Sequence, residues 1–191
     1  ADRLALCQAG SAQAIFVAGP AGVGKSALVR EALRRARGFH PVEYACFEAP
    51  NLPFAPLAHL LRALRTGYDL DARRLPGYAN LGLLLPELNA TVTADLATLT
   101  DALREVLAAV SAEKPVLFLL EDAHWADAAT LERLPALVAG LAASPVAFVV
   151  THRDEALGRE HPLVRLRGQL RRQPQFSEVK LASLPFAETA E

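Results

Sequence analysis

The chain reads Gly19-Pro20-Ala21-Gly22-Val23-Gly24-Lys25-Ser26 near its beginning, and these residues match the spacing G-x-x-x-x-G-K-[ST] at every fixed position. The apolar run 14–18 before them is typical of a buried strand, and the periodic run 27–34 after them is typical of a helix. Strand, glycine-rich turn and helix form a phosphate-binding loop (P-loop), which holds a nucleoside triphosphate. The alternative, a turn that binds nothing, is disfavoured by the complete motif in its expected context.

The residue types in this loop explain how it would bind phosphate. Glycines let backbone N–H groups point inward, because no Cβ stands in the way. The helix that begins near Lys25 adds about half a positive charge at its N-terminus. We expect Lys25 to reach the β- and γ-phosphates and the Ser26 hydroxyl to be a ligand of Mg²⁺. The predicted nucleotide-binding residues are Gly19, Pro20, Ala21, Gly22, Val23, Gly24, Lys25, Ser26 and Ala27.

Composition indicates one ordinary globular domain over residues 1–191. The chain is 52% hydrophobic and 21% charged, which excludes a disordered protein, and its net charge of −1 offers no overall attraction for nucleic acid. No apolar run reaches membrane-spanning length, and nothing resembles a signal peptide. Met is absent even at position 1, so we expect a domain of a longer polypeptide. Cys7 and Cys46 follow no metal-binding spacing and are expected to be reduced, buried thiols of a cytoplasmic protein.

Predicted strands alternate with predicted helices along the chain. This pattern indicates a parallel sheet with helices on both faces, although segment 66–93 is too interrupted by glycine and proline to assign beyond one helical turn near 81–85. We expect strands at 14–18, 42–47, 116–120, 146–150 and 178–181. We expect helices at 2–10, from 25 to 37, at 56–65, from a cap at Thr93 or Asp95 to 111, from 127 to 142 and at 161–172.

The apolar strand 116–120 ends in two acids, Glu121 and Asp122. Strands of open α/β sheets present functional side chains at their carboxyl ends, where the P-loop also lies. One carboxylate would hold Mg²⁺, and the next would orient the attacking water or accept its proton. By order along the strand, we assign Glu121 to the metal and Asp122 to the water, against the alternative of simple surface charge.

Three segments resemble one family of ATPases. The run 119–127 (LLEDAHWAD) resembles the Walker B region of signal-transduction ATPases with numerous domains (STAND), as in large ATP-binding LuxR-type transcriptional regulators and related AAA-like modules. The P-loop is similar to the P-loop of this family. The run Thr151-His152-Arg153 resembles the T-x-R sensor at the end of a strand in these proteins. Residues 53–57 resemble a proline-rich segment that follows their second strand. The resemblance covers residues 15–184, nearly the whole chain.

This resemblance implies an α/β, three-layer P-loop NTPase fold whose parallel five-stranded sheet has the order 5-1-4-3-2. It implies ATP as the nucleotide, Mg²⁺ as the metal and Arg153 as a sensor of the γ-phosphate, which completes a catalytic set with Glu121 and Asp122. A guanidinium at that edge of the sheet can make forked hydrogen bonds to phosphate, whereas the alternative is a solvated loop arginine.

The resemblance also implies a nucleotide-dependent switch. DNA would be contacted only through domains outside these residues, and nucleotide-dependent self-association stays open. One departure matters: the chain has Glu then Asp where many AAA-type motors have Asp then Glu, which favours slow hydrolysis or a module that binds nucleotide without turnover. A small-molecule phosphotransferase is the alternative from another class.

Other polar residues have simpler expected roles. We expect His124 to be a packing or capping residue, Trp125 a buried anchor and Asp127 the N-cap of a helix. The basic cluster Arg165, Arg167, Arg171 and Arg172 is expected to be a solvated helix face. Its alternatives are an arginine supplied to a neighbouring subunit's phosphate and a contact to nucleic acid.

Overall fold

A computed structural model describes residues 2–35, 37–48, 52–68, 77–88 and 95–182, and its centre is a parallel sheet. The strands are β1 (Gln13–Ala18), β2 (His40–Ala45), β3 (Val116–Glu121), β4 (Val146–His152) and β5 (Phe176–Lys180). Each neighbouring pair runs parallel in the order β2-β3-β4-β1-β5, which is the predicted order 5-1-4-3-2 viewed from the other edge. The predicted sheet is therefore confirmed.

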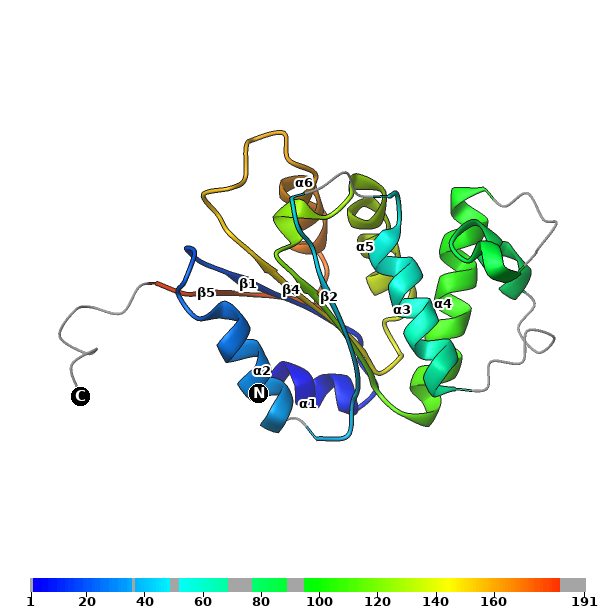
Figure 1. Ribbon diagram of the computed structural model, residues 1–191. Helices are drawn as coiled ribbons and strands as arrows, with labels where there is room; N and C mark the ends of the chain where they lie inside the picture. The colour runs from blue at the N-terminus through cyan, green and yellow to red at the C-terminus, as the bar shows by residue number, and fades with distance from the viewer. Residues whose placement is uncertain (1, 36, 49–51, 69–76, 89–94, 183–191) are drawn as a thin grey trace.

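Helices cover the two faces of this sheet and make three layers (Figure 1). On one face lie α1 (Asp2–Gln8) and α2 (Lys25–Arg35), and on the other lie α3 (Ala55–Gly67), α4 (Leu96–Glu113), α5 (Ala128–Gly140) and α6 (Pro162–Leu170). Short 3₁₀ helices are η1 (Tyr78–Leu83), η2 (Pro86–Leu88) and η3 (Ala123–Trp125). This arrangement is the three-layer α/β architecture of P-loop NTPases.

The hydrophobic core consists of two clusters, one on each face of the sheet, because successive side chains of a strand point to opposite faces. Phe16, Phe118 and Phe148 are buried in the larger cluster, beneath α3 to α6. Their strand neighbours Val17 and Leu117 are buried in the smaller cluster, beneath α1 and α2. Both faces are covered, which explains why β3 and β4 read as continuous apolar runs.

Three local boundaries differ from the sequence-based expectation, and one of them is β5, which begins at Phe176, two residues earlier than predicted. β2 begins at His40, two residues earlier than predicted, and contains Pro41. Proline lacks the N–H of a ladder bond, but β2 pairs only with β3 at the edge of the sheet, where such a residue is tolerated. The turn expected near 81–85 is the 3₁₀ helix η1.

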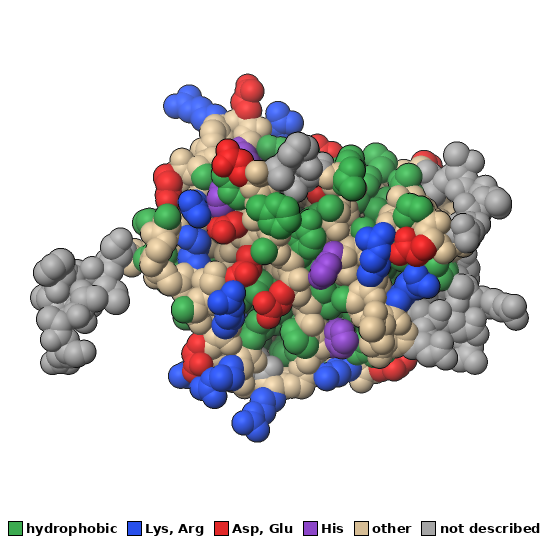
Figure 2. All heavy atoms as spheres, in the orientation of Figure 1, with side chains coloured by type: hydrophobic (Ala, Val, Ile, Leu, Met, Phe, Trp, Pro, Cys, Tyr) green, Lys and Arg blue, Asp and Glu red, His purple; other side chains and the backbone are tan. Residues whose placement is uncertain are grey.

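Helix α4 begins as one of two predicted caps requires. The Asp95 carboxylate accepts a 2.8 Å hydrogen bond from the Thr98 N–H, so Asp95 is the N-cap. The other candidate, Thr93, lies outside the described residues. On the face seen in Figure 2, acidic and basic side chains of the described residues intermingle, which agrees with the near-neutral net charge. None of the helices in the described ranges is both long and apolar enough to cross a membrane.

Candidate functional site

The glycine-rich loop connects the carboxyl end of β1 to the first residue of α2, Lys25. Gly24 has φ 93°, a left-handed conformation in which a side chain would be strained. At Gly19, an added Cβ would lie 2.7 Å from the Leu181 backbone oxygen, so this position has no room for one. The glycines are therefore needed by the shape of the loop itself, as the motif predicts.

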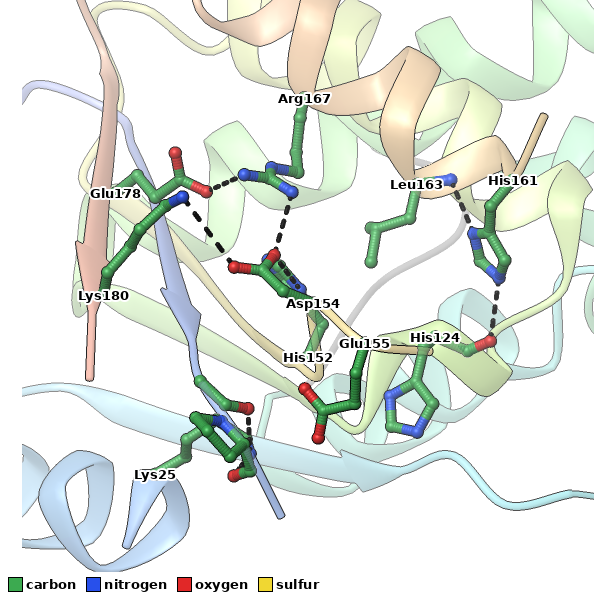
Figure 3. Close-up of polar contacts among 12 residues, drawn as sticks. Lys25, His124, His152, Asp154, Glu155, His161, Leu163, Arg167, Glu178 and Lys180 are labelled. Carbon is green, nitrogen blue, oxygen red and sulfur yellow. Dashed lines mark hydrogen bonds and ion pairs between the residues drawn. The ribbon is translucent and has the colours of Figure 1, made fainter. Parts of the chain in front are cut away.

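Lys25 is held inside the loop. Its Nζ donates hydrogen bonds to the backbone oxygens of Gly19 (2.9 Å) and Pro20 (2.7 Å), and only 8% of the residue is exposed (Figure 3). The ammonium is thus fixed at the centre of the phosphate-binding backbone. This is the placement expected of a lysine that neutralises phosphate charge.

A pocket of about 250 Å³ joins the P-loop to two residues that are remote in sequence. Its walls include most of the predicted nucleotide-binding residues, and Asp122 and Arg153 complete them. The P-loop members of this lining are Ala21, Gly22, Gly24, Lys25, Ser26 and Ala27. Larger hollows of about 510 and 580 Å³ lie elsewhere and are lined largely by apolar surface, which suits a polyanion poorly.

Asp122 follows β3 and enters the pocket through an unusual backbone conformation. Its φ of 51° and ψ of 45° are left-handed, which is uncommon outside glycine, although aspartate tolerates it better than most residues. Its N–H donates a 3.0 Å hydrogen bond to Thr151 Oγ1 of β4. Its carboxylate lies 4.0 Å from Arg153 Nε and 3.9 Å from His124 Nδ1, with the side chain 40% exposed. The acid is therefore positioned by the backbone and remains accessible.

Glu121 is directed elsewhere, although it is the adjacent residue. It ends β3 with a side chain only 14% exposed, and its Oε2 lies 3.6 Å from Arg30 Nη2 on α2. Its Oε1 is buried and has no hydrogen-bond partner among the described residues. An unpaired buried carboxylate oxygen is costly and suits a cation ligand.

The unpaired oxygen of Glu121 bears on the predicted Mg²⁺ site. The described residues contain no group of three or more His, Cys, Asp or Glu that would hold a metal by themselves. Mg²⁺ at phosphate sites takes one or two protein oxygens and completes its shell with phosphate and water. Of the two predicted ligands, Ser26 lines the pocket, whereas Glu121 is not part of its lining and faces Arg30. The unpaired Glu121 Oε1 is free to bind a cation, and its assignment to Mg²⁺ stays a prediction.

A network of ion pairs behind the pocket was not predicted. Arg167 of α6 lies 3.2 Å from Asp154 and also pairs with Glu178 of β5, and its side chain is only 14% exposed (Figure 3). Arg171 lies 2.8 Å from Glu178. The expectation of a solvated helix face is thus wrong for Arg167, because its guanidinium is held between the carboxylates of Asp154 and Glu178. Arg165 and Arg172 are exposed, as expected.

The segment after the acidic pair gives mixed results. Asp127 caps α5, accepting a 2.8 Å hydrogen bond from the Thr130 N–H, and it also accepts one from the Phe54 N–H at 2.9 Å. The His124 side chain is 1% exposed, and burial lowers its pKa. Trp125 is 36% exposed and lies against the His124 ring at 5.1 Å, so the prediction of a buried anchor is wrong. The short η3 helix gives the interior position to His124 instead.

The fold and this site define a P-loop ATPase-type module. The family model for the AAA ATPase domain matches residues 2–150, so the chain belongs to the AAA ATPase domain family and is a nucleotide-binding module of that type.

Solved structures share the fold at low sequence identity. One is Drosophila ORC bound to DNA, with TM-score 0.52 and 14% identity over 99% of this chain and 91% of that chain. Another is a STAND protein with a tetratricopeptide repeat sensor from Pyrococcus horikoshii, with TM-score 0.53 and 14% identity over 96% of this chain and 23% of that chain. The chain therefore spans less than a quarter of the STAND protein. No curated protein matches the chain in sequence.

Proposed function

We propose that the chain binds ATP with Mg²⁺, hydrolyses it slowly and acts as a switch module in a bacterial multidomain transcriptional regulator of the LuxR type. The observation that carries this proposal is the single pocket in which the P-loop, Asp122 and Arg153 meet. The resemblance of residues 119–127 to the Walker B region of such regulators supports the regulatory context.

Each residue of the pocket has a role in this proposal. The P-loop amides and Lys25 bind the phosphates, and the N-terminus of α2 adds its favourable dipole. Asp122 orients the attacking water and accepts its proton, while Arg153 stabilises the charge on the transferred phosphoryl group. Ser26 and Glu121 would hold Mg²⁺, which supplies neutralising charge at the phosphate oxygens.

The ion-pair network supports a switch. Arg153 belongs to a segment that Asp154 ties to Arg167 of α6 and, at 3.8 Å, to Lys180 of β5. A phosphate that attracts Arg153 would therefore shift the adjacent Asp154, and through Asp154 the positions of α6 and β5. Such loops, held in place by a terminal phosphate, are a known means of switching.

The wider setting belongs to the same proposal. DNA would be contacted by domains outside this chain, and nucleotide-dependent self-association would accompany the switch. Cys7 and Cys46 are free and buried, and burial raises the pKa of each thiol to about 12, so neither is a reactive thiolate near neutral pH. A cytoplasmic location is part of the proposal.

Phosphate release and thermal melting test this function together. Saturating Mg-ATP and Mg-ADP should raise the melting temperature, and Mg-GTP should raise it less. At a ligand concentration a hundredfold above Kd, the gain in the free energy of unfolding should be about 2.7 kcal/mol. Asp122→Asn should retain the ATP shift but lower phosphate release about a hundredfold, whereas the exposed Asp101→Asn on α4 should change neither. Phosphate release at the wild-type rate by Asp122→Asn would refute the water-orienting role. Turnover that requires an added acceptor would favour a phosphotransferase.

A further inference from the structure

The segment after β4 places an acidic side chain on the P-loop. Glu155 Oε1 accepts a 3.1 Å hydrogen bond from the backbone N–H of Ala21, which lies 134 residues earlier in the chain. Ala21 lines the pocket together with Lys25 and Arg153. In Figure 3 the Glu155 carboxylate projects toward the part of the site that holds Lys25. A side-chain carboxylate thus uses one of the loop amides that phosphate oxygens would use.

The surroundings of Glu155 keep this carboxylate charged. A hydrogen bond from its own backbone N–H is the main cause that holds the pKa of Glu155 below its usual range. Burial opposes this effect, and the bond from Ala21 and the Lys25 and Arg153 charges add to it. The side chain is exposed, so it can rotate away from the loop. Its backbone is less free, because the preceding residue, Asp154, is tied to Arg167 and Lys180.

The position of Glu155 points to one end of a bound nucleotide. Ala21, the partner of Glu155, lines the same pocket as Lys25, expected at the β- and γ-phosphates, and Arg153, assigned to the transferred phosphoryl group. The carboxylate therefore opposes a terminal phosphate twice, by occupying the Ala21 N–H and by repelling its negative charge. A nucleoside diphosphate leaves that end of the site without this conflict.

We propose that Glu155 is a specificity-determining residue that disfavours nucleoside triphosphate relative to diphosphate at this site. The inference rests on the proposed function, because it requires that the P-loop pocket bind nucleotide. When a triphosphate enters, the Ala21 N–H gives up its hydrogen bond to the Glu155 carboxylate and donates one to a phosphate oxygen instead. The chain then favours its diphosphate-bound form until triphosphate is in excess.

Calorimetric titration of the whole chain with Mg-ATP and Mg-ADP tests the proposal. Glu155→Gln removes the charge but keeps a hydrogen-bond acceptor of the same shape. We expect this variant to bind ATP about fivefold more tightly while its ADP affinity stays within about twofold, as suits an exposed charge close to phosphate. The gain should shrink at high salt, because exposed charges are screened. Glu160→Gln, an exposed glutamate of the same segment, is the matched control and should leave both affinities unchanged.

The outcomes separate this proposal from the one on which it rests. An unchanged ratio of ATP to ADP affinity in Glu155→Gln, with both nucleotides bound, overturns the role of Glu155 and leaves the proposed function standing. An equal gain in Glu160→Gln also overturns it, since the effect would then reflect net charge. If the folded wild-type chain binds neither nucleotide, the proposed function falls, and this inference falls with it.

Discussion

The backbone N–H of Asp122 is hydrogen-bonded to the hydroxyl of Thr151 at 3.0 Å, which ties the acid after β3 to the neighbouring strand β4. Thr151 is 1% exposed, and Asp122 has the left-handed backbone described above. Two residues after Thr151 comes Arg153, which lies 4.0 Å from the Asp122 carboxylate. One buried hydroxyl therefore fixes the relative positions of the two side chains that complete the P-loop pocket.

Thr151→Val should reduce both stability and turnover. The change keeps the shape of the side chain but leaves the Asp122 N–H without its acceptor, which should cost about 1–3 kcal/mol in the free energy of unfolding. Urea denaturation measures this loss, and phosphate release should fall with it because Asp122 is less well positioned. Thr66→Val, at an exposed position of α3, is the control and should lie within about 0.5 kcal/mol of wild type. Equal stability of Thr151→Val and wild type would contradict the positioning role.

Glu121→Gln should raise the requirement for Mg²⁺. The amide keeps the size of the side chain but removes the negative charge from the buried Oε1 that has no partner among the described residues. We expect the Mg²⁺ concentration for half-maximal ATP-induced stabilisation to rise about tenfold, and EDTA to abolish the effect in wild type and variant alike. Glu43→Gln, at an exposed position of β2, should behave as wild type. An unchanged Mg²⁺ requirement in Glu121→Gln would exclude this residue as a ligand.

His152 should make the chain less stable as the pH falls below neutral. Its side chain is fully buried, and burial lowers its pKa to about 4, from about 6.5 in the unfolded chain. The unfolded chain therefore binds more protons in this range, so the stability is fully present above pH 6.5 and is lost as the pH falls towards 4. We expect a loss of about 2 kcal/mol between pH 7 and pH 5, measured by urea denaturation.

His152→Phe provides the comparison for this pH dependence. The variant fills the site beside Phe16, whose ring lies 6.0 Å from that of His152, but it cannot take up a proton. Its stability should fall less between pH 7 and pH 5 than that of wild type, with the remaining slope coming from groups such as His124, whose pKa is also lowered by burial. An identical slope in both proteins would show that His152 does not titrate as described.

Local sequence patterns predict most of the fold because they record burial directly. The apolar runs of β3 and β4 reflect cover on both faces of the sheet, and the glycine-rich loop between a strand and a helix marks β1 and α2. The start of β2 at His40, two residues earlier than predicted, shows what local patterns cannot predict. Whether Pro41 ends a strand depends on whether a second neighbour needs its N–H, and that is a property of the assembled sheet.

The site was predictable where its residues follow strand ends and not where they depend on distant partners. Asp122 and Arg153 reach the P-loop pocket because β1, β3 and β4 are parallel, so their carboxyl ends share one edge of the sheet. Arg167 looked like any helix-surface arginine, since its carboxylate partners lie 13 and 11 residues away on other elements. The bond between Glu155 and Ala21 joins segments 134 residues apart, and no local spacing could indicate it.

Calorimetric titration of wild type and Lys25→Ala with Mg-ATP tests the central claim most directly. Lys25 is held at the centre of the loop by the Gly19 and Pro20 carbonyls, so its removal takes a fixed positive charge from the phosphates. We predict saturable binding at one site in the wild-type chain and in the exposed-lysine control Lys114→Ala, with affinity lost by about thirtyfold or more in Lys25→Ala. Folded wild-type protein that gives no saturable heat, or a Lys25→Ala variant that binds as tightly as wild type, would contradict it.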